Sequence, residues 1–132
     1  MAARKQRFAL GIWGTSLVLG TLALHAQDGI KRTEIQSHDL SIPGRQAVQQ
    51  MVELQPGVVS EKHTHPGEEI AIVLEGELVF QLAGKPDVTV KAGQPFFAPA
   101  GAVHGVKNGN AVTKLLATYV VEKGKPLRTP AK

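Results

Sequence analysis

The sequence predicts an all-β fold, an antiparallel sandwich or barrel of roughly eight or nine short strands. Apolar and polar residues alternate in short segments, for example at Leu78, Phe80 and Leu82, which is the pattern of half-buried strands. The 132 residues include 14 glycines and 8 prolines, which indicate frequent turns. No stretch longer than a turn or two has helical periodicity, so long helices are not expected.

Composition indicates one domain, because the chain is short and 42% of it is hydrophobic. The absence of cysteine excludes disulfides, zinc–thiolate sites, iron–sulfur clusters and cysteine nucleophiles. A net charge of +4 suggests a nucleic-acid partner at first sight. However, Arg4, Lys5 and Arg7 lie in the first few residues, and several other basic residues lie in the C-terminal segment. We therefore predict no nucleic-acid partner.

Residues 1–26 have the pattern of a secretory signal peptide. A basic start precedes an uncharged apolar run from Phe8 to Leu24, and the segment ends on the small residue Ala26. The run is diluted by glycine, serine and threonine and is shorter than the ~20 apolar residues of a spanning helix. We expect cleavage, a periplasmic or secreted protein and no membrane partner afterwards; an uncleaved anchor is the alternative. His25 belongs to this leader and has no predicted chemical role.

Residues 27–45 are polar and are expected to form an irregular N-terminal arm. Within it, Leu40 and Ile42 are candidates to add a strand or to cover one end of the barrel, and Pro43 begins a turn. His38 has no partner at ligand spacing and is interpreted as an ordinary surface residue.

The β pattern predicts a barrel over residues 46–121, followed by a solvated basic tail at 122–132. Val48, Val52 and Leu54 share one parity and belong to the first strand. The predicted strands are 47–54, the segment before Pro66, 69–74, 77–82, 87–91, 96–98, 103–108 and 111–121. Glycines expected to reverse the chain with positive φ are Gly57, Gly76, Gly93 and Gly101.

Two histidines and a glutamate gather in the stretch GVVSEKHTHPGEEIAIVLEG at residues 57–76. His63 and His65 are two positions apart, so they share one face of a strand. A turn after them brings Glu69 back toward both rings. Two imidazoles and a carboxylate make a partial metal site. Glu68 has the opposite parity and is expected in solvent, unless an irregular turn exchanges it with Glu69.

A further histidine lies in the stretch GQPFFAPAGAVHGVKN at residues 93–108. His104 follows the turn from Pro99 to Gly101 and has the parity of Val106, so its side chain is expected inside the barrel. Asn108 is interpreted as a turn-forming residue and not as a ligand.

The two stretches resemble the two motifs of the cupin family. The first motif is Gly-x5-His-x-His-x3-Glu-x6-Gly, and Gly57, His63, His65, Glu69 and Gly76 match its fixed positions. The second motif is Gly-x5-Pro-x-Gly-x2-His-x3-Asn, and Gly93, Pro99, Gly101, His104 and Asn108 match its fixed positions. The resemblance covers about residues 47–121 and implies a cupin jelly roll, or double-stranded β-helix. It also implies a homodimer paired through outer sheet faces.

The resemblance further implies that one divalent transition metal is coordinated by His63, His65, Glu69 and His104. Three imidazoles and a carboxylate leave two octahedral positions open, and Fe, Mn, Ni, Co, Cu and Zn all accept this set. An exported, metal-dependent oxygenase similar to quercetinase-like dioxygenases, with a small-molecule substrate, is the leading expectation.

Two alternatives to the oxygenase remain: a non-catalytic cupin that holds a metal or small ligand, and a cupin isomerase or decarboxylase. The latter needs an extra acid, base or cation near the metal. The matched region contains no arginine and Arg45 lies just outside it, which disfavours oxalate-like dianions unless Arg45 or a lysine folds in. Gln50 and Tyr119 are candidates for substrate contact, and no catalytic residue is assigned.

Overall fold

The computed structural model describes residues 27–132, and within that range the chain forms ten strands and no helix. The predicted all-β class is therefore confirmed. The predicted signal peptide at residues 1–26 lies outside the described residues. Over the described part of the chain, no helix of a length and hydropathy suited to crossing a membrane is present.

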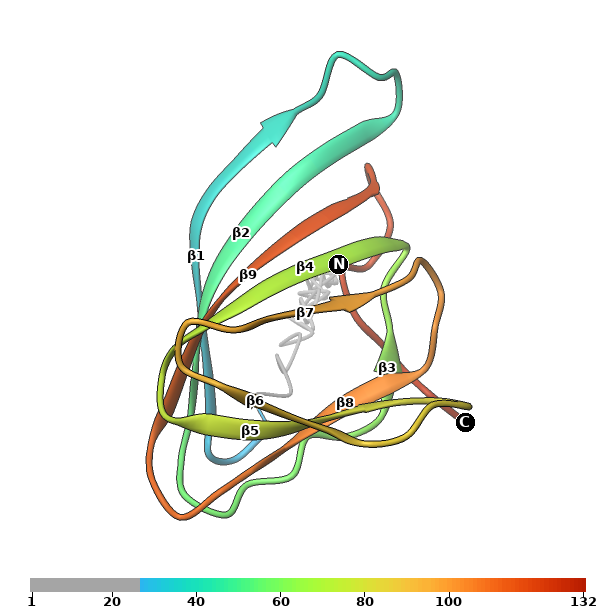
Figure 1. Cartoon of the computed structure of the whole chain (residues 1–132). Helices are drawn as coiled ribbons and strands as arrows, with labels where there is room; N and C mark the ends of the chain where they lie inside the picture. Colours follow the sequence, from blue (N-terminus) through green and yellow to red (C-terminus); the bar gives the residue numbers. More distant parts are fainter. Residues whose placement is uncertain (1–26) are drawn as a thin grey trace, which may run out of the picture.

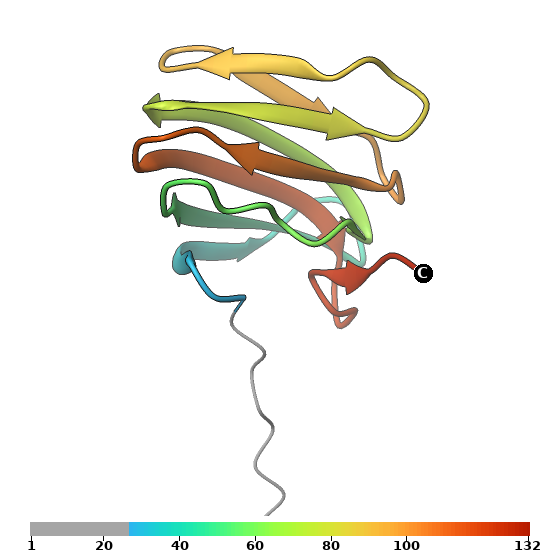
Figure 2. The same ribbon diagram turned by 90° about the horizontal axis from the view of Figure 1, so that it is seen from below.

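Two five-stranded antiparallel sheets face each other, as Figures 1 and 2 show from two directions. The first sheet contains, in spatial order, β1 (Ile30–Asp39), β2 (Arg45–Leu54), β9 (Thr113–Glu122), β4 (Gly67–Glu75) and β7 (Pro95–Ala98). The second contains β10 (Thr129–Pro130), β3 (His63–Thr64), β8 (His104–Asn108), β5 (Glu77–Leu82) and β6 (Val88–Lys91). This arrangement is the predicted jelly roll.

The core lies between the two sheets and follows the alternation of each strand. Along β9, every second residue from Thr113 to Val121 is buried. Val48, Val52 and Leu54 of β2 are buried as their shared parity predicted. Burying alternate side chains between two facing sheets removes one face of each sheet from water, which is the main driving force for this architecture.

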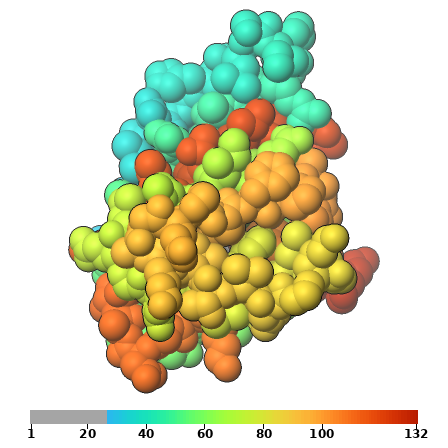
Figure 3. All heavy atoms as spheres, viewed as in Figure 1, coloured from blue at the N-terminus to red at the C-terminus, as the bar shows by residue number. Residues whose placement is uncertain are grey.

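The expectation of an irregular arm over residues 27–45 is wrong, because Ile30–Asp39 forms β1 and pairs antiparallel with β2. Only Ile30 in this strand is buried. Backbone pairing with β2 therefore holds β1 in the sheet. Because the sequence of β1 is polar and has no apolar–polar alternation, this strand could not be recognised from the sequence. Leu40 and Ile42 form no strand and lie in the connection to β2. Atoms of this hairpin, coloured cyan, extend beyond the body in Figure 3.

The expectation of a solvated tail over residues 122–132 is also wrong in part. Thr129 and Pro130 form β10 and pair with Thr64 and His63 of β3. Leu127, just before this strand, packs against the core. A two-residue strand has no periodicity to recognise, and it exists because β3 offers it an edge.

The turn glycines have the predicted conformation, with φ of 72° at Gly57, 79° at Gly76, 85° at Gly93 and 70° at Gly101. Gly67 has a different role. A Cβ at this position would lie 1.9 Å from the carbonyl oxygen of Val120 on β9. The close approach of β4 to β9, two residues before Glu69, therefore depends on a glycine at position 67.

Candidate metal centre

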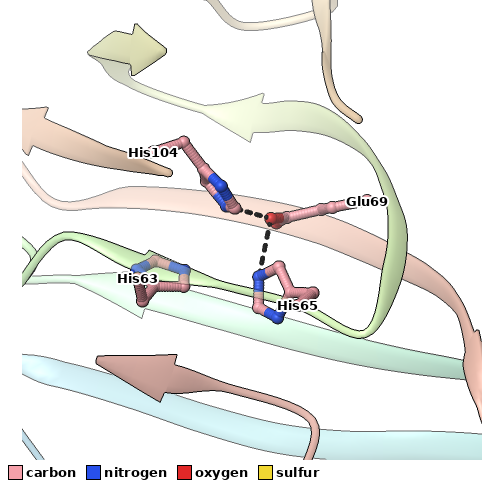
Figure 4. Close-up of side chains that lie close together, drawn as sticks. All are labelled: His63, His65, Glu69 and His104. Atoms are coloured by element: carbon pink, nitrogen blue, oxygen red, sulfur yellow. Dashed lines mark hydrogen bonds and ion pairs between the residues drawn. The ribbon is translucent and has the colours of Figure 1, made fainter. Parts of the chain in front are cut away.

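Four ligand-type side chains meet between the sheets: His63 from β3, His65 from the connection between β3 and β4, Glu69 from β4 and His104 from β8. One donor atom from each of His63, His65, Glu69 and His104 lies within 4.8 Å of the others. Each of the four residues is no more than 7% exposed. Figure 4 shows two dashed contacts from the Glu69 carboxylate, one to the ring of His65 and one to the ring of His104.

Strand pairing explains the convergence. His63 on β3 is directly opposite His104 on β8. Glu69 on β4 lies in the facing sheet, between Tyr119 of β9 and Ala98 of β7. The parity prediction therefore holds: Glu69 points inward, whereas Glu68 has the opposite orientation and is half-buried.

Hydrogen bonds determine which ring nitrogens carry protons. The Nδ1 atoms of His63 and His104 lie 2.8 Å from the Glu61 carbonyl oxygen and 2.9 Å from that of Ala102. The Nδ1 atom of His65 contacts the carbonyl oxygen of Leu127. Because a carbonyl only accepts, each Nδ1 donates, and each neutral ring presents an Nε2 lone pair. An oriented imidazole of this kind is typical of metal sites.

The Nε2 atoms then create an electrostatic conflict. Those of His65 and His104 lie 3.1 Å and 2.9 Å from Oε2 of Glu69. With neutral rings, these short contacts oppose lone pairs of nitrogen and oxygen. A cation shared by the four residues relieves this repulsion and satisfies the donors together. The chemistry of the donor set therefore fits a divalent metal ion.

The pKa directions agree with ligand states at neutral pH. Burial, followed by the charge of Arg128 and the neighbouring histidines, lowers the pKa of His63 to about 3 despite the opposing hydrogen bond to Glu61. For Glu69, burial raises the pKa, but a proton donated from Nε2 of His104 or His65, in the place that a metal ion would take, outweighs burial and lowers the pKa to about 2. Neutral imidazole and ionised carboxylate are the forms that bind metals.

A cavity of about 200 Å³ adjoins the four residues. Its wall includes Gln50 and Tyr119, the two candidates for substrate contact, and it also includes Arg32 and Arg128. The remaining lining residues are Val52, Leu54, Ser60, Phe96, Val106, Leu115 and Leu127. Arg45, the arginine considered from sequence, does not line this cavity.

Sequence reasoning missed Arg32 and Arg128 because it placed them in an irregular arm and a solvated tail. One signal was available for Arg32: it shares strand parity with Ile30, which is buried. No comparable signal existed for Arg128, whose position depends on the pairing of β10 with β3.

Tyr119 is 4% exposed, and its ring centroid lies 4.7 Å from that of His65. Burial, together with the nearby Glu69 carboxylate, raises the pKa of the Tyr119 hydroxyl far above its ordinary value. The hydroxyl therefore stays protonated and can donate a hydrogen bond, either to the Glu69 carboxylate or to a ligand in the cavity.

Asn108 has a structural role, but it is the last residue of β8 and not the turn-forming residue that was expected. Its side-chain amide donates to the carbonyl oxygens of Leu54, Gln55 and Ala111, at 3.1, 2.8 and 2.9 Å. These bonds hold the connection after β8 against the end of β2. His38 is exposed and contacts Gln36 on its own strand, away from the four-residue cluster.

Comparison with known families gives one match, to a model described as "Cupin domain", over residues 50–128. This match covers more than half of the chain. No curated protein matches the sequence.

Several solved structures share the fold. An uncharacterized protein with a double-stranded beta-helix domain from Klebsiella pneumoniae is 19% identical with a TM-score of 0.66, covering 81% of this chain and 88% of its own. An oxalate oxidase in complex with glycolate is 23% identical with a TM-score of 0.64 (81% and 57% covered). The DMSP lyase DddQ from Ruegeria pomeroyi is 24% identical with a TM-score of 0.60 (64% and 43% covered). This chain thus spans less than two thirds of both enzymes.

Proposed function

The chain belongs to the cupin domain family, and from that premise we propose that it holds one divalent transition metal and acts as a small-molecule oxygenase. The proposed ligands are His63, His65, Glu69 and His104. One observation carries the metal proposal: all three Nδ1 atoms donate to backbone carbonyls, so the three Nε2 atoms face the cavity beside the same carboxylate.

A divalent metal bound there supplies Lewis acidity and, if it is redox-active, electrons for oxygen chemistry. The oxygenase proposal follows from the resemblance to quercetinase-like dioxygenases and from a ligand set that leaves coordination positions open. Fe, Mn, Ni, Co, Cu and Zn all satisfy the donor set.

The chain's own residues shape the reaction space beside this site. Leu54, Phe96 and Leu115 form apolar parts of the wall and restrict water in the cavity. Tyr119 is placed to donate a hydrogen bond to a substrate oxygen. Gln50 on β2 lines the cavity and offers both a donor and an acceptor.

A second candidate is favoured by a specific observation. Decarboxylation and isomerisation need a further acid, base or cation near the metal. Two cations, Arg32 and Arg128, share the cavity with the four-residue cluster. The sequence argument disfavoured oxalate-like dianions because residues 47–121 contain no arginine; Arg32 and Arg128 lie outside that range but line the cavity.

The test combines metal analysis with turnover. The purified protein is expected to contain close to one transition metal ion per chain. The protein loaded with Fe(II), Mn(II), Ni(II), Co(II) or Cu(II) is then supplied with flavonols, catechols and β-diketones while oxygen uptake is recorded. Carbon dioxide release from small carboxylic acids tests the second candidate, and H104A is the inactive control. Stoichiometric metal with no turnover of any substrate overturns both catalytic proposals and leaves a binding protein.

Export and assembly are separate proposals. We propose that residues 1–26 direct secretion and are removed, and that the mature protein pairs with a second copy. The mass of the chain recovered from the periplasm or medium tests export, with a start at Gln27 expected. A chain that retains Met1 and remains with the membrane contradicts it.

A further inference from the structure

We propose that Arg32 and Arg128 form a carboxylate-binding subsite, so that the cavity selects a small organic acid and presents it to the metal centre. This inference rests on the proposed function, because it specifies the substrate class of the same site. The sequence analysis disfavoured oxalate-like dianions for lack of arginine and considered only Arg45 or a lysine as a cation able to fold in.

The two arginines come from opposite sheets. Arg32 lies on β1, the edge strand of the first sheet, and Arg128 directly precedes β10, the edge strand of the second. Both line the cavity that contains His63, His65, Glu69 and His104. Two guanidinium groups thus flank one small space that also adjoins the cluster of ligand-type residues.

Arg128 is only partly satisfied by protein groups. Its Nη2 donates to the carbonyl oxygen of Glu61 at 3.0 Å, and its Nη1 lies 3.4 Å from the exposed Glu61 carboxylate. Its Nε is buried and has no hydrogen-bond partner. A buried guanidinium N–H without an acceptor is costly, and a ligand oxygen in the cavity would satisfy it.

Arg32 is a half-buried cation, and no ion pair to it is found within residues 27–132. Burial, and next the positive charge of Arg128, lower the pKa of Arg32, which agrees with the proximity of the two guanidinium groups. Like charges held close together in a partly buried space repel, and an anion placed between them removes that repulsion.

The charges of the cavity favour an anion. Two arginines, the ionised Glu69 and the Glu61 carboxylate that pairs with Arg128 balance to zero, and a divalent metal raises the net charge to plus two. A negatively charged ligand therefore enters a positive site once the metal is bound, and without it meets the two guanidinium groups locally. The planar guanidinium group of arginine also matches the two oxygens of a carboxylate.

The size and the wall of the cavity favour a small organic acid over a bare inorganic anion. At about 200 Å³ the space is smaller than a typical drug-sized pocket of ~300 Å³ or more. Much of its wall is apolar, including Val52, Val106 and Leu127. Such a wall gains free energy from a hydrocarbon body and gains little from phosphate.

Binding of isobutyrate, followed by NMR titration, tests the subsite with a branched apolar acid. The matched neutral ligand is isobutyramide, which has the same shape without the charge, and inorganic phosphate is the competing anion. We expect isobutyrate to bind at least about tenfold more tightly than isobutyramide, since a charge-assisted bond is stronger than a neutral one. Equal binding of the two, or tighter binding of phosphate than of isobutyrate, overturns the proposal.

The variants R32Q and R128Q are each expected to weaken isobutyrate binding about tenfold or more, with little change for isobutyramide. R45Q is the matched control, because Arg45 is the first residue of β2 and lies outside the cavity wall. R128K is expected to recover part of the loss, since it restores the charge without the planar group. An effect of R45Q as large as that of R32Q would show a general charge effect and overturn the subsite.

Two further measurements separate this inference from its alternatives. Thermal unfolding of R128Q tests whether Arg128 has only a structural role, which is to hold the C-terminal segment against Glu61. We expect R128Q to lose isobutyrate affinity while its Tm is unchanged. If R128Q does not fold, R32Q alone decides the result. Metal stoichiometry is measured in every variant: metal binding without carboxylate selectivity rejects this inference alone. Absence of metal rejects the proposed function, while isobutyrate binding to the metal-free protein still tests the two arginines.

Discussion

The Nε2 atom of His104 lies 2.9 Å from Oε2 of Glu69, although 35 positions separate the two residues. The two side chains come from different sheets, His104 from β8 and Glu69 from β4. Both are nearly inaccessible to solvent, at 2% and 5% exposure. The contact therefore links the two sheets, and a metal ion bound by this pair would be held by residues of both.

Replacing His104 by alanine is expected to weaken metal binding by ~100-fold or more, because even the loss of a residue that only orients a ligand costs 10–100-fold. Competition with a chromophoric chelator measures the change. H38A is the control, since His38 is exposed and contacts only Gln36 on β1. Metal affinity of H104A equal to that of the unmodified protein would contradict the assigned ligand set.

Acidification is expected to destabilise the metal-free protein from about pH 6.5 downward. The pKa of His63 falls from 6.5 in the unfolded chain to about 3 in the folded protein, so between these values the unfolded state binds the extra proton. The pKa of Glu69 falls from 4.5 to about 2, so its contribution is present above pH 4.5 and is lost toward pH 2. Each group contributes a slope of at most about 1.4 kcal/mol per pH unit.

Urea unfolding at a series of pH values measures this dependence. H63Q is expected to flatten the slope between pH 6.5 and 4.5, whereas H38Q leaves it unchanged. An identical slope in H63Q and in the unmodified protein would show that His63 does not titrate in this range.

Deletion of residues 126–132 is expected to weaken metal binding about 10–100-fold, the range for loss of partners that orient ligands. The deletion removes the Leu127 carbonyl that accepts from His65 Nδ1 and the pairing of β10 with β3. Chelator competition and thermal unfolding report the two effects. K125A serves as control, since Lys125 is exposed and lies before this segment. Unchanged affinity after deletion would show that the Leu127 carbonyl does not orient His65 for metal binding.

Substituting Gly67 by alanine is expected to destabilise the protein by about 1–3 kcal/mol or more, the usual range for overpacking. The new Cβ would meet the Val120 carbonyl oxygen at 1.9 Å, which forces β4 away from β9. Since β4 carries Glu69, metal affinity is expected to fall as well. G109A is the control, because its Cβ meets nothing closer than 3.8 Å. Equal urea midpoints for the two variants would rule out this packing constraint.

The proposed homodimer is expected to pair through the outer face of the first sheet. Ile70 on β4 and Phe97 on β7 are directly opposite each other and are each 50% exposed, beside Ile72 at 37%. An exposed apolar patch of this kind favours association. F97E is expected to convert a dimer to a monomer in analytical ultracentrifugation, whereas V88E, at an exposed site on the other sheet, does not. A dimer that survives F97E must use another face.

Local patterns were sufficient to predict the centre of the molecule. The spacing of His63 and His65, the turn before Glu69 and the alternation around His104 each involve close neighbours in sequence, although β3 ends at Thr64 and His65 follows it outside the strand. Because successive side chains in a strand point to opposite faces, such spacing predicts which side chains point into the barrel. Val48, Val52 and Leu54 of β2 were recognised as sharing one parity, and all three are buried.

Other features required the full arrangement of the strands. β1 and β10 are edge strands held by backbone hydrogen bonds, which leave no mark on the pattern of side chains. The places of Arg32 and Arg128 in the cavity depend on those two strands, and so does the contact of Leu127 with His65. Spacing along the chain thus identified the candidate metal ligands, whereas pairing between distant segments determined that Arg32 and Arg128 line the cavity next to them.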